Sequence, residues 1–346
     1  MNQYDWGELL KMKGELFYKG ILRQEDGYFI IRQSIPYPLA ENNVFLIESN
    51  RGWTVIDVGI DLPPTRDVWE MAVKEVGISF KQIDQIYITH CHPDHLGAAR
   101  WLQKVCDAPV FIPRKEIMRA QEFIFIEEDF PAVYRRAIEP EANRHGFPAD
   151  ILEQLIIDWQ DQVTPLFKKP YEIFPLDEGA EIELGADKFQ VSLLPGHADG
   201  QVMLFDQRSG RLFCADMLSE AAYLHFTDWP NTHLNNPLGS LFNSMDQLES
   251  LEVSKVYPGH GPCFQNLPEL LLSLREKHLR RLEKVLRAVR EPITAGDLYP
   301  QLYAATDYVH HHRLLLGETL GYLEFLASDG QLRRIDDGEK VRFAGN

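Results

Sequence analysis

Short apolar runs separated by turn residues dominate the first sixty residues. Three such runs, YFIIRQ, NNVFLIES and WTVIDVG, fall between about residues 28 and 59 and are broken by Pro36, Pro38 and a turn at residues 49–52. Apolar runs of four to eight residues bounded by Pro, Gly, Ser and Asn are typical of β-strands. We therefore predict three strands here.

Helices and strands alternate in the next fifty residues. Residues 65–76 carry apolar side chains at helical spacing, and the apolar run QIYIT follows at residues 85–89. A second helical pattern at residues 96–105 leads into a further strand, PVFI, at residues 109–112. This rhythm predicts a sheet covered by helices.

The pattern changes between residues 114 and 169 into a long helical stretch in which aromatic and charged residues are interspersed. We interpret this stretch as an insertion in the sheet domain. It has two interpretations, a lid whose aromatic side chains form an apolar substrate pocket, or a contact between two subunits of a homodimer. We favour the lid, because a helical excursion from a sheet edge can cover a site and exclude water.

Strands return after the insertion and predict a second sheet. The runs EIELG, FQVSLLP, QVMLFD and RLFCAD lie between residues 171 and 216, and a helix at about residues 239–251 precedes the strand KVYPG. Beyond residue 265 we predict three helices and a hairpin that turns at Asp337 and Gly338. The chain thus divides into a large domain, residues 1–265, and a small winged-helix-like domain, residues 266–346.

Composition narrows the range of functions. The chain has 346 residues, is 45% hydrophobic and carries a formal net charge of -17, so it can bury a large core and repels polyanions. Binding to nucleic acid or to a membrane is therefore not expected, and a small-molecule substrate is favoured. The first twenty residues contain Asp5, Glu8 and Glu15 where a secretory signal needs an apolar run, and the four cysteines share no CxxC spacing. We expect a cytoplasmic protein with reduced thiols.

The strongest chemical signal is the hexapeptide HCHPDH at residues 90–95, which holds three of the twelve histidines. It lies where a predicted strand ends and a helix begins. His90 and His92 point the same way in an extended turn and can bind one metal ion, whereas Asp94 and His95 at the helix start point to a second. One loop can therefore supply ligands to two metal sites.

The HxHxDH pattern resembles the signature of the metallo-β-lactamase superfamily, and the later parts of that signature follow in order. His197 lies in PGHADG, Asp216 ends the run LFCAD, and His260 lies in YPGHG. Asp57, at the end of WTVID, matches an early aspartate that orders the histidine loop. The chain departs from the family pattern beside two of these residues. After His197 it has Ala198, Asp199 and Gly200, where the family commonly has a small or prolyl residue, and before Asp216 it has Ala215, where the family commonly has glycine.

The resemblance implies an α/β fold, an αββα sandwich of two facing mixed β-sheets with helices outside. It also implies a site for two divalent metal ions, zinc by default with iron or manganese as alternatives. The implied ligands fall into three sets: His90, His92 and His197 on the first metal, Asp94, His95 and His260 on the second, and Asp216 as the bridge. Metal ions held by Asp94 and Asp216 would share a hydroxide that attacks a small ester, thioester or lactone, as in glyoxalase II and lactonases.

Other residues and other functions stay open. Tyr223 and His225 are candidates for a hydrogen bond to the substrate carbonyl, Cys91 reads as a buried filler, and the tract at residues 310–312 reads as a solvated helix start. One alternative is a metal-dependent ribonuclease, which the acidic charge disfavours. Another is a non-hydrolytic diiron protein that binds oxygen.

Overall fold

The computed structural model describes residues 21–23, 27–35, 41–126, 130–220, 225–227, 232–306 and 308–346. Some residues singled out above lie outside these ranges, namely Asp5, Glu8, Glu15, Pro36, Pro38 and Tyr223. None of the helices in these ranges is long and apolar enough to cross a membrane.

The first sheet contains seven strands within the described ranges, in the order β1-β2-β3-β4-β5-β6-β7. Strands β1 to β4 pair antiparallel and β4 to β7 pair parallel. The bounds are β1 Ile21–Arg23, β2 Phe29–Ser34, β3 Glu41–Glu48, β4 Trp53–Ile56, β5 Ile83–Tyr87, β6 Val110–Pro113 and β7 Ile173–Leu176. The three predicted strands before residue 59 correspond to β2, β3 and β4.

The second sheet has the order β12-β11-β10-β9-β8. Its strands are β8 Glu181–Leu184, β9 Asp187–Leu193, β10 Val202–Asp206, β11 Arg211–Ala215 and β12 Lys255–Pro258. Strands β8 to β11 form an antiparallel meander, and β12 joins β11 in parallel.

The two sheets pack face to face. Their shared apolar layer contains Ile30 and Phe45 from the first sheet and Val191, Leu204 and Phe213 from the second, all buried. The rings of Phe45 and Phe213 meet edge to face at 4.9 Å between centroids, which is a favourable aromatic geometry.

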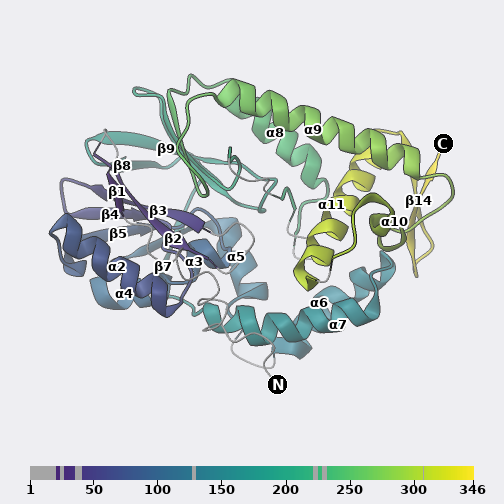
Figure 1. The fold of residues 1–346 in the computed structure, drawn as a ribbon, viewed down its shortest axis with the longest axis horizontal. Coiled ribbons are helices and arrows are strands. Elements are labelled where there is room, and N and C mark those ends of the chain that lie inside the picture. Colours follow the sequence, from purple (N-terminus) through teal and green to yellow (C-terminus); the bar gives the residue numbers. More distant parts are fainter. Residues whose placement is uncertain are drawn as a thin grey trace.

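Helices cover the outer faces. Helices α2 Pro63–Val76 and α4 Ala99–Cys106 lie over the first sheet, and α8 Pro237–Glu249 lies against the second. The fold is therefore the αββα sandwich that the sequence predicts (Figure 1). The predicted helix at residues 96–105 is interrupted, because the short helix α3 Pro93–Leu96 ends before α4 begins.

A helical layer lies beside the sandwich, on the right in Figure 1. It combines the insertion with the C-terminal residues. The insertion begins with α5 Arg114–Phe123, which lies against β6 and β7 of the first sheet. The elements of the layer are α6 Phe130–Arg144, α7 Ala149–Asp158, two short turns at Trp159–Val163 and Thr164–Leu166, α9 Leu267–Ala288, α10 Ala295–Leu302, α11 Val309–Ser328, β13 Leu332–Asp336 and β14 Val341–Gly345. The three helices and the hairpin predicted after residue 265 are present, whereas their likeness to a winged helix stays a prediction.

The insertion packs against the C-terminal elements. Arg144 at the end of α6 forms an ion pair with Asp336 of β13 at 2.5 Å, and the backbone N–H of Gly296 donates to the carbonyl of His145 at 2.8 Å. At the start of α11, His310 contacts Asp158 of α7 at 2.5 Å. The histidine tract is thus a packed contact between helices, and its interpretation as a solvated helix start is wrong.

Candidate metal centre

Strand ends deliver the candidate ligands. The loop after β5 carries His90 and His92, the turn after β9 carries His197, Asp216 directly follows β11, and His260 lies two residues beyond β12. The sequence placed these residues in four separate segments. The two facing sheets bring all four segments to one edge of the sandwich, where loops are free to carry function.

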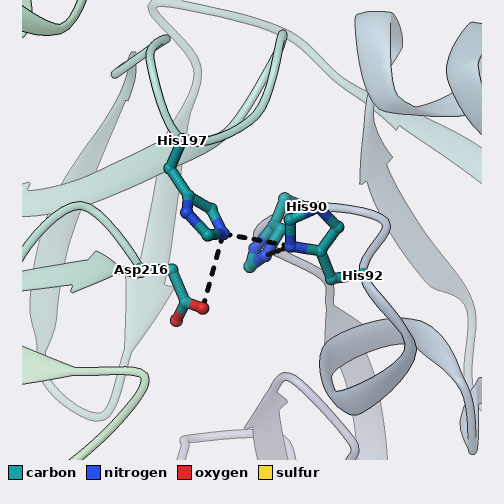
Figure 2. A group of neighbouring side chains, drawn as sticks. All are labelled: His90, His92, His197 and Asp216. Carbon is teal, nitrogen blue, oxygen red and sulfur yellow. Dashed lines mark hydrogen bonds and ion pairs between the residues drawn. The ribbon is translucent and has the colours of Figure 1, made fainter. Parts of the chain in front are cut away.

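The first group consists of three histidines and an aspartate, shown in Figure 2. His92 Nδ1 lies 3.0 Å from His90 Nε2 and 3.0 Å from His197 Nε2. His197 Nε2 is also 3.5 Å from an oxygen of Asp216. The three ring nitrogens therefore converge on one point with a carboxylate beside it.

The second group consists of Asp94, His95 and His260. His260 Nε2 lies 3.1 Å from Asp216 Oδ2 and 3.3 Å from Asp94 Oδ2, and His95 Nε2 lies 3.3 Å from Asp216 Oδ1. Asp216 thus contacts both groups through its two oxygens. All seven residues singled out in the sequence meet in one buried cluster.

The donors fit divalent cations. His95 Nε2 and Asp216 Oδ1 face each other at 3.3 Å, but neither buried atom forms a hydrogen bond of good geometry, which is costly unless something else binds them. Burial and the neighbouring imidazoles lower the pKa of His90 well below its ordinary value, and burial together with His92 lowers the pKa of His197 to about 4. Both histidines are therefore neutral, the form that binds a metal.

Two carboxylates, Asp94 and Asp216, adjoin the histidines of the second group. Burial opposes ionisation of Asp94 and Asp216, but the adjacent histidines hold the pKa of both carboxyls below the ordinary value. In return, despite its burial, the pKa of His260 rises to about 10, chiefly because of Asp216. When no metal ion is bound, these carboxylates stabilise protons on the buried imidazoles. A divalent ion can take the place of those protons.

The ring nitrogens that face away from the centre are held by fixed acceptors. His197 Nδ1 donates to the carbonyl of His225 at 2.6 Å, and His260 Nδ1 donates to the carbonyl of Glu41 at 2.6 Å. His95 Nδ1 donates to Asp57 Oδ2 at 2.8 Å. These bonds fix each tautomer and leave Nε2 with a lone pair toward the centre. The predicted role of Asp57 as an orienting residue agrees with this contact.

Backbone strain marks two positions next to the centre. Asp57 and Ala215 adopt φ of 57° and 46°, a left-handed conformation that glycine adopts more readily. The family pattern implies a glycine at this position, and a left-handed conformation at Ala215 costs about 1–2 kcal/mol. At Gly259, an added Cβ would lie 2.2 Å from Asp216 Oδ1, so the side chain of Asp216 requires a glycine there.

Glu116 is a functional residue that sequence reasoning missed. This side chain of α5 is 1% exposed, and its two oxygens accept the backbone N–H of Cys91 at 2.9 Å and of Gly200 at 2.6 Å. One carboxylate therefore ties the loop of His90 and His92 to the loop of His197. The sequence RKEI around Glu116 has the polarity of an exposed first turn, so no signal in it indicated burial.

The departure from the family pattern at Asp199 also has a structural role. Asp199 is buried and accepts Thr232 Oγ1 at 2.6 Å and the backbone N–H of His233 at 2.7 Å. Arg119 of α5 lies 3.4 Å from its second oxygen. The insertion thus supports the His197 loop through Arg119 as well as Glu116.

A small cavity, partly open to solvent, adjoins the centre. Two candidate ligands form part of its wall, and helices α8 and α9 form the opposite side. The described residues that line it are His197, Asp216, Met217, Ser219, His225, Leu241, Met245, Leu274 and His278. None of these comes from residues 114–169, so the proposal that the insertion contacts substrate stays a prediction. Cys91 is 4% exposed and packs in the core, in keeping with a filler.

Comparison with known proteins agrees with this geometry. The sequence profile of the metallo-beta-lactamase superfamily matches residues 38–260, a span that includes every candidate ligand. The chain belongs to the metallo-β-lactamase superfamily. A relative in this superfamily, the probable metallo-hydrolase YqjP of Bacillus subtilis, is 25% identical over 323 residues, 90% of this chain and 96% of its own length.

Other relatives extend the comparison. The metallo-beta-lactamase family protein TTHA1429 from Thermus thermophilus has a solved structure that superposes with a TM-score of 0.78 and 27% identity, covering 93% of this chain and 99% of that one. The acyl-coenzyme A thioesterase MBLAC2 of Gallus gallus is 24% identical over 229 residues, 64% of this chain and 73% of its own. The superfamily match and these relatives support a hydrolase.

Proposed function

We propose that this protein is a dinuclear metal-dependent hydrolase that cleaves a small ester, thioester or lactone. One observation carries the proposal: Asp216 lies between two groups of donors, 3.5 Å from His197 on one side and 3.1 Å from His260 on the other. A carboxylate shared between a group of three histidines, of which His90 and His197 are held neutral, and a more acidic group suits two ions close together.

The side chains have separate tasks in such a reaction. His90, His92 and His197 would hold one ion, which would polarise a substrate carbonyl. Asp94 and Asp216 supply the negative charge that offsets two cations. When bound, two divalent ions would supply a water of lowered pKa and stabilise developing negative charge on oxygen. Zinc suits the imidazole and carboxylate donors, and iron or manganese are the alternatives.

Among acyl substrates we favour a thioester. The relative MBLAC2 is named an acyl-coenzyme A thioesterase, and a thiolate leaves without protonation by a side-chain acid. Tyr223 was a candidate donor to the carbonyl but lies outside the described residues. His225 lines the cavity, and its carbonyl accepts from His197; both observations support a contact between this residue and substrate.

The ribonuclease alternative depends on a basic track along α9. Two of the arginines on this helix are paired within it, Arg280 with Glu276 and Arg287 with Glu283, both at 3.2 Å. Arg275 is paired with Asp246 of α8 at 2.6 Å. Paired and interleaved charges of this kind favour a solvated helix face over a phosphate track. A small acyl substrate, with no nucleic acid or membrane partner, remains our proposal.

A substrate panel tests the proposal. Protein reconstituted with a defined metal is assayed on p-nitrophenyl esters, acyl thioesters, lactones and single-stranded RNA at low and moderate salt. We expect turnover of an acyl substrate that changes little with salt, whereas phosphate contacts would make RNA cleavage fall steeply. RNA cleavage that Arg280→Glu with Arg287→Glu abolishes would support the nuclease. A coloured, iron-loaded protein without hydrolysis of any substrate would support the diiron alternative.

A further inference from the structure

The acceptor that orients His197 differs from those of two other candidate ligands. His95 and His260 donate from Nδ1 to groups at the end of β4 and at the start of β3, which the first sheet fixes. His197 Nδ1 instead donates to the carbonyl of His225 at 2.6 Å. His225 belongs to neither sheet and lies between β11 and α8 in the sequence. The orientation of the His197 ring therefore depends on what holds residues 225–227.

Helix α11 contacts this segment from the side of the helical layer, where it packs against α7, α8, α9 and α10 (Figure 1). His225 Nδ1 lies 3.2 Å from Glu318 Oε1. The Glu318 side chain is buried, and the Tyr303 hydroxyl donates to its second oxygen at 3.4 Å. A buried carboxyl group needs such partners because it has lost its hydration. Glu318 therefore holds the ring of His225 against α11.

Phe226 gives the segment a second contact with α11. Its ring is buried and lies 5.1 Å from the ring of Tyr322 and 5.4 Å from the ring of His278 on α9, both edge to face. The Phe226 ring also covers Gly321, where an added Cβ would lie 2.5 Å from Cε2 of the phenylalanine. Glu318 precedes Gly321 and Tyr322 by three and four residues, so these residues share one face of the helix. This face of α11 contacts two consecutive residues of the segment.

We propose that α11 positions the candidate metal ligand His197, with Glu318 and Gly321 as positioning residues that act through residues 225–227. The inference rests on the metal centre of the proposed function and adds a role for the C-terminal elements. A hydrogen bond from Nδ1 keeps the proton on that nitrogen and directs the lone pair of Nε2 toward the metal. When the carbonyl of His225 moves, the His197 ring loses this acceptor and can rotate or change tautomer. The first metal site then binds more weakly, whereas the histidines of the second group keep the acceptors that the first sheet provides.

Gly321→Ala tests the proposal, because the three atoms nearest to the added Cβ all belong to Phe226. Alanine is otherwise more favourable than glycine inside a helix, so α11 itself should remain folded. Glu318→Gln is a second variant, which keeps the shape of the side chain and replaces one accepting oxygen by an NH₂ group. Phe226→Leu combined with Gly321→Ala makes room for the added Cβ. The control for a general loss of stability is Leu332→Ala in β13, at a buried position.

Metal-free protein is titrated with Co²⁺, and its visible spectrum follows the two binding steps. The step that His197→Ala removes belongs to the first metal site. We expect Gly321→Ala to weaken this step by about 10- to 100-fold and Glu318→Gln by about fivefold, with the other step within about threefold of the wild type. The double variant should recover most of the loss, because the two substitutions act on one contact. Leu332→Ala should leave both steps within about threefold of the wild type.

A loss confined to one metal site is a result that a merely structural role of α11 does not give. Equal weakening of both steps by Gly321→Ala, an equal loss in Leu332→Ala, or unchanged affinities in both α11 variants would overturn the proposal. The titration needs no turnover, so it separates this inference from the proposed function. A selective loss in protein that hydrolyses no acyl substrate would support the positioning role and contradict the hydrolase. Hydrolysis with unchanged Co²⁺ affinities in both α11 variants would do the reverse, and a wild type that binds no Co²⁺ would overturn both.

Discussion

Two buried carboxylates flank the histidine loop without facing the metal centre. Asp57 orients His95 and also accepts the backbone N–H of Thr89 at 2.8 Å. Glu116 accepts the backbone N–H of Cys91 and of Gly200. The loop is therefore held from both sides by charge-assisted hydrogen bonds, which are stronger than neutral ones.

Glu116→Gln replaces one of the two accepting oxygens by an NH₂ group. This group cannot accept a hydrogen bond, so the bond to either Cys91 or Gly200 is lost. We expect Glu116→Gln to weaken binding of a metal ion at the His90, His92 and His197 group by about 10- to 100-fold. Titration of metal-free protein with Co²⁺, followed by its visible spectrum, measures this. Glu122→Gln on the same helix, at a 45% exposed side chain, is the control. Equal affinity of the two variants would refute the role of Glu116.

Comparison of the two aspartates tests their different roles. Asp216→Ala removes the charge that both donor groups share, whereas Asp57→Asn keeps a residue that tolerates positive φ and loses only an orienting carboxylate. We therefore expect the Asp216 variant to lose kcat by several orders of magnitude and the Asp57 variant by about 10- to 100-fold. The assay is run at equal metal occupancy, measured by elemental analysis. Losses of equal size would mean that the roles are misassigned.

Elements that are far apart in the sequence pack around the site. Helix α5 of the insertion supports the ligand loops, α8 and α9 line the cavity, and α6 and α7 rest on α11 and the hairpin. His145, just after α6, is 4% exposed, and its carbonyl accepts the N–H of Gly296. This contact joins the insertion to the C-terminal elements.

The contact at His145 should be sensitive to acid. Burial lowers the pKa of His145 from 6.5 to about 4, so between these values the unfolded chain binds a proton that the folded chain does not. The stabilisation is complete above about pH 6.5 and is lost as the pH falls toward 4, by on the order of 3 kcal/mol. Urea unfolding at pH 7 and pH 4.5 should show a smaller loss of stability for His145→Gln than for the wild type.

A matched control for this prediction is His233→Gln, at a side chain that is 62% exposed. Its loss of stability between the two pH values should equal that of the wild type. A variant at His145 that loses as much stability as the wild type would show that His145 is not the group responsible.

Sequence patterns predicted the elements better than the contacts between them. The strands and the seven candidate ligands could be predicted because each ligand or ligand cluster lies shortly after an apolar run, in the order of the family signature. Glu116 could not, because a single glutamate in a polar helical turn has no periodicity that reveals burial. Met245 and Leu274 have the pattern of core residues, and only the packing of α8 and α9 against the centre turns them into the wall of a cavity.

In the whole molecule, the metal centre joins the two sheets. The first sheet supplies His90, His92, Asp94 and His95 through the loop after β5, and the second supplies the remaining three candidate ligands. Ions bound there would cross-link segments that are otherwise held by the apolar layer between the sheets.

Metal removal should therefore destabilise the entire fold. A ligand that binds only the folded state at 100 times its Kd adds about 2.7 kcal/mol for each site. We expect close to two metal ions per chain in protein purified without chelator, and a melting temperature that falls by about 5 °C or more after stripping. Elemental analysis and thermal melts check this. A stripped protein that melts at the same temperature would contradict the cross-linking role.

The distribution of ligands along the chain has a consequence for biosynthesis. The histidine loop is complete at residue 95, but His260 lies 165 residues later. At about 5–20 residues per second, a ribosome needs on the order of ten seconds or more to synthesise that stretch. During this interval the nascent loop has its own four donors and lacks the bridge and the last histidine of each site. Tight, selective capture of a metal therefore has to wait for the later strands, so the supply of ions when synthesis ends decides which metal the finished protein contains.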